Sequence, residues 1–133
     1  MGTRIHSGTD RMVEEKAFRR PDLPAMRTAA AGFGAHAGMG AARAGDFVLA
    51  VSEAAASVVC HGPCMAKLRL WTAGQQVLCE ARGDGMLFES GPRALRRADP
   101  GALRVALLEK LCDHVCVESG SSGVIVRFSM AVA

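Results

Sequence analysis

The sequence predicts an α+β fold: a two-layer sandwich with three main helices on one face of a mostly antiparallel sheet. Two stretches in the first half repeat apolar residues at helical spacing. The segments that follow alternate apolar and charged residues, as half-buried strands do. A third helical stretch then leads into further alternating segments. This order of elements is typical of the α+β class, because helices and hairpins are segregated and do not form parallel βαβ units.

The chain has 133 residues, enough for one domain with its own core. We assign residues 12–133 to that domain and residues 1–11 to a flexible polar tail. No apolar run approaches the roughly 20 residues of a membrane span, and the N-terminus has no apolar core of a signal peptide. We therefore expect a cytoplasmic protein with no membrane association.

The first half is expected to contain a strand over 12–18 and two helices. Asp22 and Pro24 mark the start of the first helix, because Asp caps well and Pro costs no hydrogen bond in the first turn. This helix is expected to end at Gly38, and its apolar stripe is Leu23, Met26, Ala30, Phe33 and Ala37. The second helix is expected from Asp46 to His61, ended by Gly62 and Pro63, with the stripe Phe47, Val51, Ala54 and Val58.

The second half is expected to begin with an antiparallel hairpin over 66–81, turning at 73–75. One face of the hairpin is apolar, and the other carries charged residues. A loop over 89–99 leads to a third helix, which opens at Asp99-Pro100. The expected stripe of this helix is Leu103, Leu107, Leu111 and Val115, with Leu108 beside it. Short strands are expected over 115–117 and 124–130, with a turn at 119–123 between them.

Composition argues against a nucleic-acid partner. The net charge is only +3, aromatic residues make up 5% of the chain, and there is no Tyr. Platforms that stack bases need several aromatic side chains beside a basic groove. We therefore expect no nucleic-acid binding.

The five cysteines allow two interpretations. The clusters Cys60-His61-x-x-Cys64 and Cys112-x-His114-x-Cys116 could supply the four ligands of a zinc site. Their spacings are not the usual C-x2-C, however, and Cys is a common small buried residue. We favour packing over metal binding and expect a reducing compartment, since the number of cysteines is odd. A thiol or zinc sensor is the alternative.

Three polar residues on the second helix are the candidate functional row. Glu53, Ser57 and His61 are four residues apart, so they are expected on one helix face. Each also has a structural interpretation: Glu53 as a solvated or paired carboxylate, Ser57 as a small packed residue, and His61 as a favourable charge at a helix C-terminus.

The pattern Ser52-Glu53-Ala54 followed by His61-Gly62, together with the order of elements, resembles the anti-sigma-factor serine kinases. These small bacterial regulators belong to the GHKL ATPase superfamily, which has the histidine-kinase-like Bergerat fold. The resemblance covers roughly residues 18–130. It implies a sigma factor and an anti-anti-sigma factor as partners, and a possible homodimer.

The resemblance also implies where an ATP site would lie. Glu53 takes the place of the general base, and Ser57 stands where the family has the Asn that holds Mg2+. The family's Asp-x-Gly-x-Gly motif falls on Gly83, Asp84 and Gly85, which puts Asp84 one residue out of place and toward the opposite face of its strand. Losing the adenine acceptor should cost ~1–3 kcal/mol.

The remaining ATP-site positions depart from the family pattern as well. At the phosphate-binding Gly-x-Gly stands Ala102-Leu103-Arg104, with Gly101 one residue early. Arg93, Arg96 and Arg97 occupy the lid position, and His61 ends the helix pattern. Four departures in one site imply that ATP and Mg2+ bind weakly or not at all. The resemblance thus implies a regulator that binds its partner by mass action. The alternative is an active ATP-dependent serine protein kinase, with Glu53 as base, Ser57 at Mg2+ and the loop arginines on the phosphates.

Overall fold

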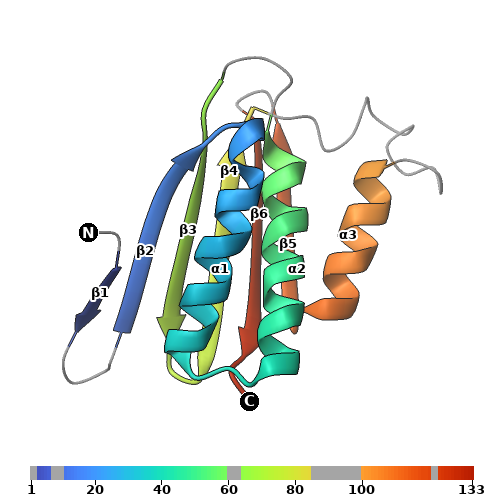
Figure 1. The fold of residues 1–133 in the computed structure, drawn as a ribbon. Helices are drawn as coiled ribbons and strands as arrows, with labels where there is room; N and C mark the ends of the chain where they lie inside the picture. Colours follow the sequence, from blue (N-terminus) through green and yellow to red (C-terminus); the bar gives the residue numbers. More distant parts are fainter. Residues whose placement is uncertain (1–2, 7–10, 60–63, 85–99, 121–122) are drawn as a thin grey trace.

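The computed structural model of the chain is an α+β sandwich with its three helices on one face of a single sheet (Figure 1). It describes residues 3–6, 11–59, 64–84, 100–120 and 123–133, and for residues 3–6, 11 and 100–103 it describes the backbone alone. The helices are α1 (Leu23–Ala37), preceded by a short 3-10 turn η1 (Arg20–Asp22), α2 (Ala41–Val58) and α3 (Pro100–Leu111). The strands are β1 (Thr3–His6), β2 (Arg11–Phe18), β3 (Ala66–Ala73), β4 (Gln76–Gly83), β5 (His114–Gly120) and β6 (Gly123–Ala131).

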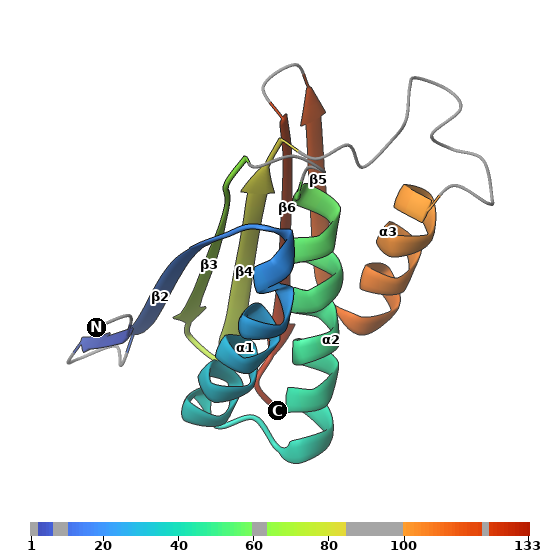
Figure 2. The ribbon, with the colours of Figure 1, turned by 45° about the horizontal axis from the view of Figure 1, so that its top comes forward.

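The six strands follow the order β1-β2-β3-β4-β6-β5, and every neighbouring pair is antiparallel. The mostly antiparallel sheet expected from the sequence is therefore antiparallel throughout the described part. Both views show α1 and α2 lying side by side over the sheet, with α3 beyond α2 (Figures 1 and 2). The opposite face of the sheet carries none of the three described helices.

The first helix confirms its prediction. Residue Gly38 ends α1 in the left-handed conformation, with φ of 96°, which an L side chain rarely adopts. Asp22 takes the N-cap position, although its carboxylate accepts from the Arg19 N–H at 3.0 Å and makes no cap bond to the helix. The expected stripe faces the sheet, with Met26, Ala30 and Phe33 buried and Leu23 and Ala37 at its borders.

The bounds predicted for the second helix are wrong at both ends. Helix α2 begins at Ala41, five residues before Asp46, and ends at Val58, because Val59 is already extended, with φ of −79° and ψ of 140°. His61, the third residue of the expected polar row, lies outside the described residues. The proposed stop at Gly62-Pro63 lies outside the described residues. The apolar stripe itself is confirmed: Phe47, Val51, Ala54 and Val58 are all fully buried.

The hairpin, the third helix and the last two strands are all present, with three corrections. The turn expected over 119–123 is wrong at both ends, because β5 continues to Gly120 and β6 begins at Gly123. The hairpin turn has two residues, Gly74 and Gln75, because Ala73 pairs with Gln76. Helix α3 ends at Leu111, so Val115 lies on β5 and cannot belong to the helical stripe. Leu108, expected beside the stripe, is fully buried.

Strand β1 lies in the segment that was expected to be a flexible tail. Thr3–His6 pairs with β2 in register from Thr3 opposite Glu14 to His6 opposite Arg11. The domain thus extends further toward the N-terminus than the sequence indicated. Among the described helices, none is long and apolar enough to cross a membrane.

The core fills the space between the sheet and the helices. Three aromatic rings meet there: Phe47 lies between Phe33 and Phe128, with ring centroids 6.5 and 6.0 Å away. Alternate residues of β3, β4 and β6 point into the same layer and are buried, among them Leu68, Leu70, Cys79 and Val126.

One polar cluster joins the start of α2 to both C-terminal strands. The Asp113 carboxylate accepts from the Ala131 N–H at 2.6 Å and from Arg43 Nη2 at 3.1 Å, and Arg43 Nε donates to the Ala131 carbonyl at 2.9 Å. Arg43 thereby holds the first turn of α2, which precedes the predicted helix start at Asp46.

We predict that Asp113→Ala lowers the free energy of unfolding by about 1.5 kcal/mol, because two hydrogen bonds to a carboxylate are lost. Asp46→Ala is the matched control, since Asp46 is exposed on α2, and it should change stability by less than about 0.5 kcal/mol. Urea denaturation measures both. Equal effects of the two substitutions would contradict the structural role of Asp113.

Candidate functional site

Glu53, the candidate base, faces α3 and forms an ion pair with Arg104. Glu53 Oε1 lies 3.7 Å from Arg104 Nε, and the two side chains are 26% and 35% exposed. The buried Arg104 Nε has no hydrogen-bond partner among the described residues. The carboxylate that would act on a substrate is therefore next to a cation from the neighbouring helix.

Ser57 is buried, and its hydroxyl is used within α2. Ser57 Oγ donates to the carbonyl of Glu53 at 2.7 Å, the i−4 bond that Ser often makes in a helix. The hydroxyl hydrogen is thus directed at the helix backbone. Glu53 and Ser57 lie one turn apart on α2, as the spacing predicted.

Gly83, at the end of β4, packs directly on the end of α2. A Cβ atom built on Gly83 would lie 2.3 Å from the Val58 carbonyl oxygen and 3.0 Å from Ala66 Cβ. Real Cβ atoms do not approach a carbonyl oxygen so closely, so this backbone accepts glycine alone. The resemblance places the adenine-binding Asp at this position.

Asp84 is exposed and lines a concavity on the open face of the sheet, away from the helices. Its Oδ1 would be 3.3 Å from a Cβ built on Gly123, at the start of β6. Asp84 comes one residue after the position of the family's Asp. It therefore lies on the open face of the sheet, whereas Glu53 lies on the side of the helices.

The other predicted site residues are not assembled around Glu53. Gly101 is the second residue of α3, within the helix and not in a loop before it. His61, Gly85, Arg93, Arg96 and Arg97 lie outside the described residues.

Two concavities occur on the open face of the sheet. One, of about 540 Å3, is lined by Lys67, Arg82, Asp84, Glu118 and Ser119 among others. The second, of about 470 Å3, shares Lys67 and Arg82 and extends toward β2. Both volumes are in the range of small-molecule sites, roughly 300–1,000 Å3.

The cysteines that the structure describes do not converge. Cys79 is buried in the core, Cys112 is half-buried beside α3, and Cys116 is exposed on β5. Cys64 is disulfide-bonded, which differs from the expectation of a reducing compartment. Within the described part of the chain, no group of three or more His, Cys, Asp or Glu side chains could hold a metal ion.

The free thiols are expected to differ in reactivity. Burial, with a contribution from Asp113, raises the pKa of Cys112 to about 12, and burial raises the pKa of Cys79 well above its ordinary value. At pH 8 on the order of one Cys112 in ten thousand is a thiolate, and the thiolate is the reactive form.

We predict that iodoacetamide at pH 8 alkylates Cys116 first. The reaction at Cys112 should quicken about tenfold for each unit of rising pH up to about 12. Peptide mass spectrometry measures this, and equal labelling of the three thiols would contradict it.

Two sets of residues were missed as functional candidates. Arg104 is a sequence candidate only as the replacement for a phosphate-loop glycine, and no sequence signal places it beside Glu53. Lys67 and Arg82 were treated only as the polar side of a hairpin. A two-residue turn would have placed them opposite each other.

No protein-family model matches this chain, and no curated protein matches it significantly.

Proposed function

We propose that this protein is a bacterial regulator of the anti-sigma-factor type, which binds a sigma factor or an anti-anti-sigma partner and holds ATP weakly or not at all. The histidine-kinase-like ATPase fold is part of this proposal, and the helix layer on an antiparallel sheet is compatible with it. The observation that carries the proposal is the ion pair between Glu53 and Arg104.

The ion pair opposes a catalytic role of Glu53 in two ways. A general base must reach the proton that it abstracts, whereas this carboxylate faces a guanidinium from α3. Arg104 also stands where the resemblance puts a phosphate-binding glycine. A long side chain at that position takes space that backbone N–H groups and phosphates would need.

The positions for the metal and the adenine support the same conclusion. Mg2+ requires oxygen ligands at near-octahedral geometry, but Ser57 is buried with its hydroxyl donated to the Glu53 carbonyl. An adenine-binding Asp does not fit at Gly83, because its Cβ would lie against the Val58 carbonyl oxygen. The Glu53–Arg104 ion pair therefore disfavours the phosphates at this site. The Ser57 hydrogen bond disfavours the metal, and the close packing at Gly83 disfavours adenine.

Calorimetric titration with ATP and Mg2+ tests the nucleotide half of the proposal. We expect no saturable heat up to millimolar nucleotide. A micromolar Kd that is lost in Glu53→Ala and kept in Glu109→Ala would contradict the proposal. Glu109 is a suitable control because it is exposed on α3 and has no ion pair among the described residues.

The alternative, an active serine protein kinase, is favoured by one observation: about a quarter of the Glu53 side chain is exposed. A swing of Arg104 toward the phosphates would leave this carboxylate available as a base. Phosphate transfer from labelled ATP to a candidate anti-anti-sigma protein measures this activity, and we expect none above background.

Transcription reconstituted from purified components tests the partner half of the proposal. The protein is added to RNA polymerase charged with each sigma factor of its source bacterium in turn. We expect it to repress one alternative sigma factor and to spare the housekeeping one, equally with and without ATP. Failure to inhibit any of them would contradict the proposed partner class.

A further inference from the structure

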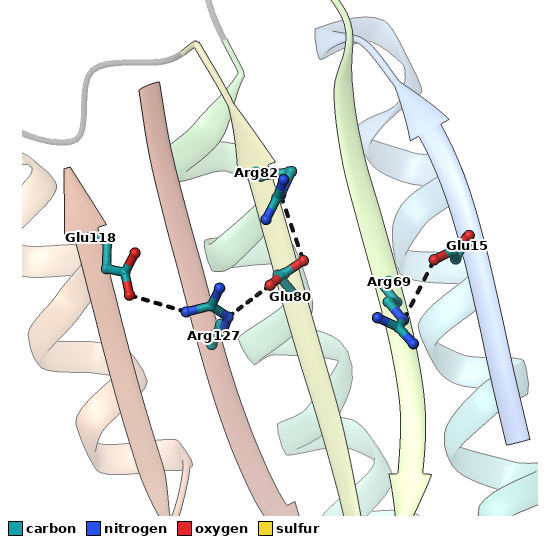
Figure 3. A network of polar contacts seen from close by, with 6 residues as sticks. All are labelled: Glu15, Arg69, Glu80, Arg82, Glu118 and Arg127. Carbon is teal, nitrogen blue, oxygen red and sulfur yellow. Dashed lines mark hydrogen bonds and ion pairs between the residues drawn. The ribbon is translucent and has the colours of Figure 1, made fainter. Parts of the chain in front are cut away.

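The open face of the sheet carries a ladder of charged side chains whose neighbours have opposite signs (Figure 3). Glu15 on β2 pairs with Arg69 on β3 at 3.5 Å, and Glu80 on β4 pairs with Arg127 on β6 at 2.7 Å. Arg127 also reaches Glu118 on β5 at 3.2 Å. Opposite charges in cross-strand positions stabilise a sheet.

One position in the register breaks this alternation. Lys67 on β3 lies directly opposite Arg82 on β4. Their other cross-strand neighbours are Ala17 on β2 and Ile125 on β6, which carry no charge. Like charges that face each other across a sheet destabilise it, so the Lys67–Arg82 pair is unfavourable for the stability of the sheet.

The nearby carboxylates compensate the pair only in part. Glu80 is held by Arg127, whose hydrogen bond to Glu80 raises the pKa of Arg127 and keeps it charged. Arg82 is the more distant partner of Glu80, at 3.6 Å. Lys67 is exposed and has no ion-pair partner among the described residues.

The concavity of about 540 Å3 described above opens beside Lys67 and Arg82. Part of its floor is bare backbone, since Gly83 and Gly123 line it, and a Cβ on Gly123 would lie against the Gly83 carbonyl oxygen. Asp84, Glu118 and Ser119 stand at its border. The site thus offers two cations and glycine backbone, with the hydrogen-bonding side chains of Asp84, Glu118 and Ser119 in the same lining.

We propose that Lys67 and Arg82 form a binding site for a phosphorylated small molecule on the open face of the sheet. The two cations bind the phosphate, for which Arg offers a bidentate fork and Lys a point charge. Asp84 and Glu118 accept hydrogen bonds from hydroxyl groups on the organic part of the ligand. This site lies on the side of the sheet away from Glu53 and does not depend on the proposed anti-sigma function.

Titration by NMR of the 15N-labelled protein tests the site, with inorganic phosphate and glycerol 3-phosphate as probes. Sodium chloride at matched ionic strength serves as the unspecific anion. We expect saturable shifts at the amides of Lys67, Arg82, Asp84 and Ser119, with glycerol 3-phosphate the tighter ligand. Lys67→Gln and Arg82→Gln should each weaken binding about tenfold, as expected for loss of a charged hydrogen bond.

Arg69→Gln is the matched control. Arg69 lies on the same strand and face as Lys67, but it pairs with Glu15 and stacks over the Trp71 ring at 4.9 Å. Arg69→Gln should change the Kd of either phosphate less than about twofold. Asp84→Asn should lower the Kd of inorganic phosphate, because it removes a negative charge that repels the anion.

Three results would overturn the proposal: no saturable shift with either phosphate, equal losses in Arg69→Gln and Lys67→Gln, or shifts that chloride reproduces. Equal affinities for the two phosphates would overturn the part given to Asp84 and Glu118. The unliganded spectrum of each variant reports whether it is folded.

Discussion

Gly83→Ala is expected to lower the free energy of unfolding by about 3 kcal/mol, a loss typical of severe overpacking. The added Cβ would lie 2.3 Å from the Val58 carbonyl oxygen, a backbone atom that cannot turn aside as a side chain can. Strand β4 and the end of α2 must then separate. Denaturation in urea and thermal melting both measure the loss, which should lower the Tm by about 10 °C in a domain of this size.

Gly120→Ala is the control for this experiment. Gly120 also lies in a strand, β5, but a Cβ built there meets nothing within 4 Å. It should leave stability within about 0.5 kcal/mol of the parent. If both variants were equally stable, the close approach of β4 to α2 would be wrong, and with it the closed adenine position.

Phe47→Ala is expected to lower the free energy of unfolding by about 4 kcal/mol, the usual cost of removing a large aromatic side chain from a core. Phe47 is fully buried on α2, and its ring lies between Phe33 of α1 and Phe128 of β6. The substitution would leave a cavity where both helices meet the sheet. Urea denaturation followed by circular dichroism gives the difference.

Leu49→Ala gives the matched comparison two residues further along the same helix. Leu49 is 42% exposed, so its truncation removes little buried area and should cost less than about 1 kcal/mol. A similar cost at both positions would contradict the orientation of α2 over the sheet.

The fold was predictable wherever the apolar pattern had one clear period. The alternation in 66–81 identified the hairpin and its buried face, and the three- and four-residue spacing identified α1. The exact turn was missed, because Gly74 and its neighbours allow a loop of two or three residues. That single residue decides whether Lys67 faces Arg82 or the two side chains point to opposite faces of the sheet.

Helix ends were predicted less well, for physical reasons. Two glycines, Gly40 and Gly45, suggested a turn before Asp46, yet α2 runs through Gly45 from Ala41. The contacts of Arg43 with Asp113 and Ala131 stabilise this extra turn, and they come from residues far away in the sequence. At the other end, Val59 leaves the helix before any Gly or Pro is reached.

The candidate site was predictable only in part. The spacing of Glu53 and Ser57 placed them on one face of α2, but the direction of each polar group depends on its neighbours. The Glu53 carboxylate turns to Arg104 of α3, and the Ser57 hydroxyl turns back to its own helix. A single sequence gives no distance between α2 and α3, so the ion pair could not be foreseen.

The central claim of the proposal is that the face of α2 with Glu53 and Ser57 does not accommodate Mg-ATP. A crystal structure of the protein grown with a non-hydrolysable ATP analogue and Mg2+ tests it most directly. We predict electron density for Arg104 beside Glu53, and none for base, triphosphate or metal at that helix. Ordered nucleotide and a metal ion next to Glu53 and Ser57, with Arg104 displaced, would contradict the claim.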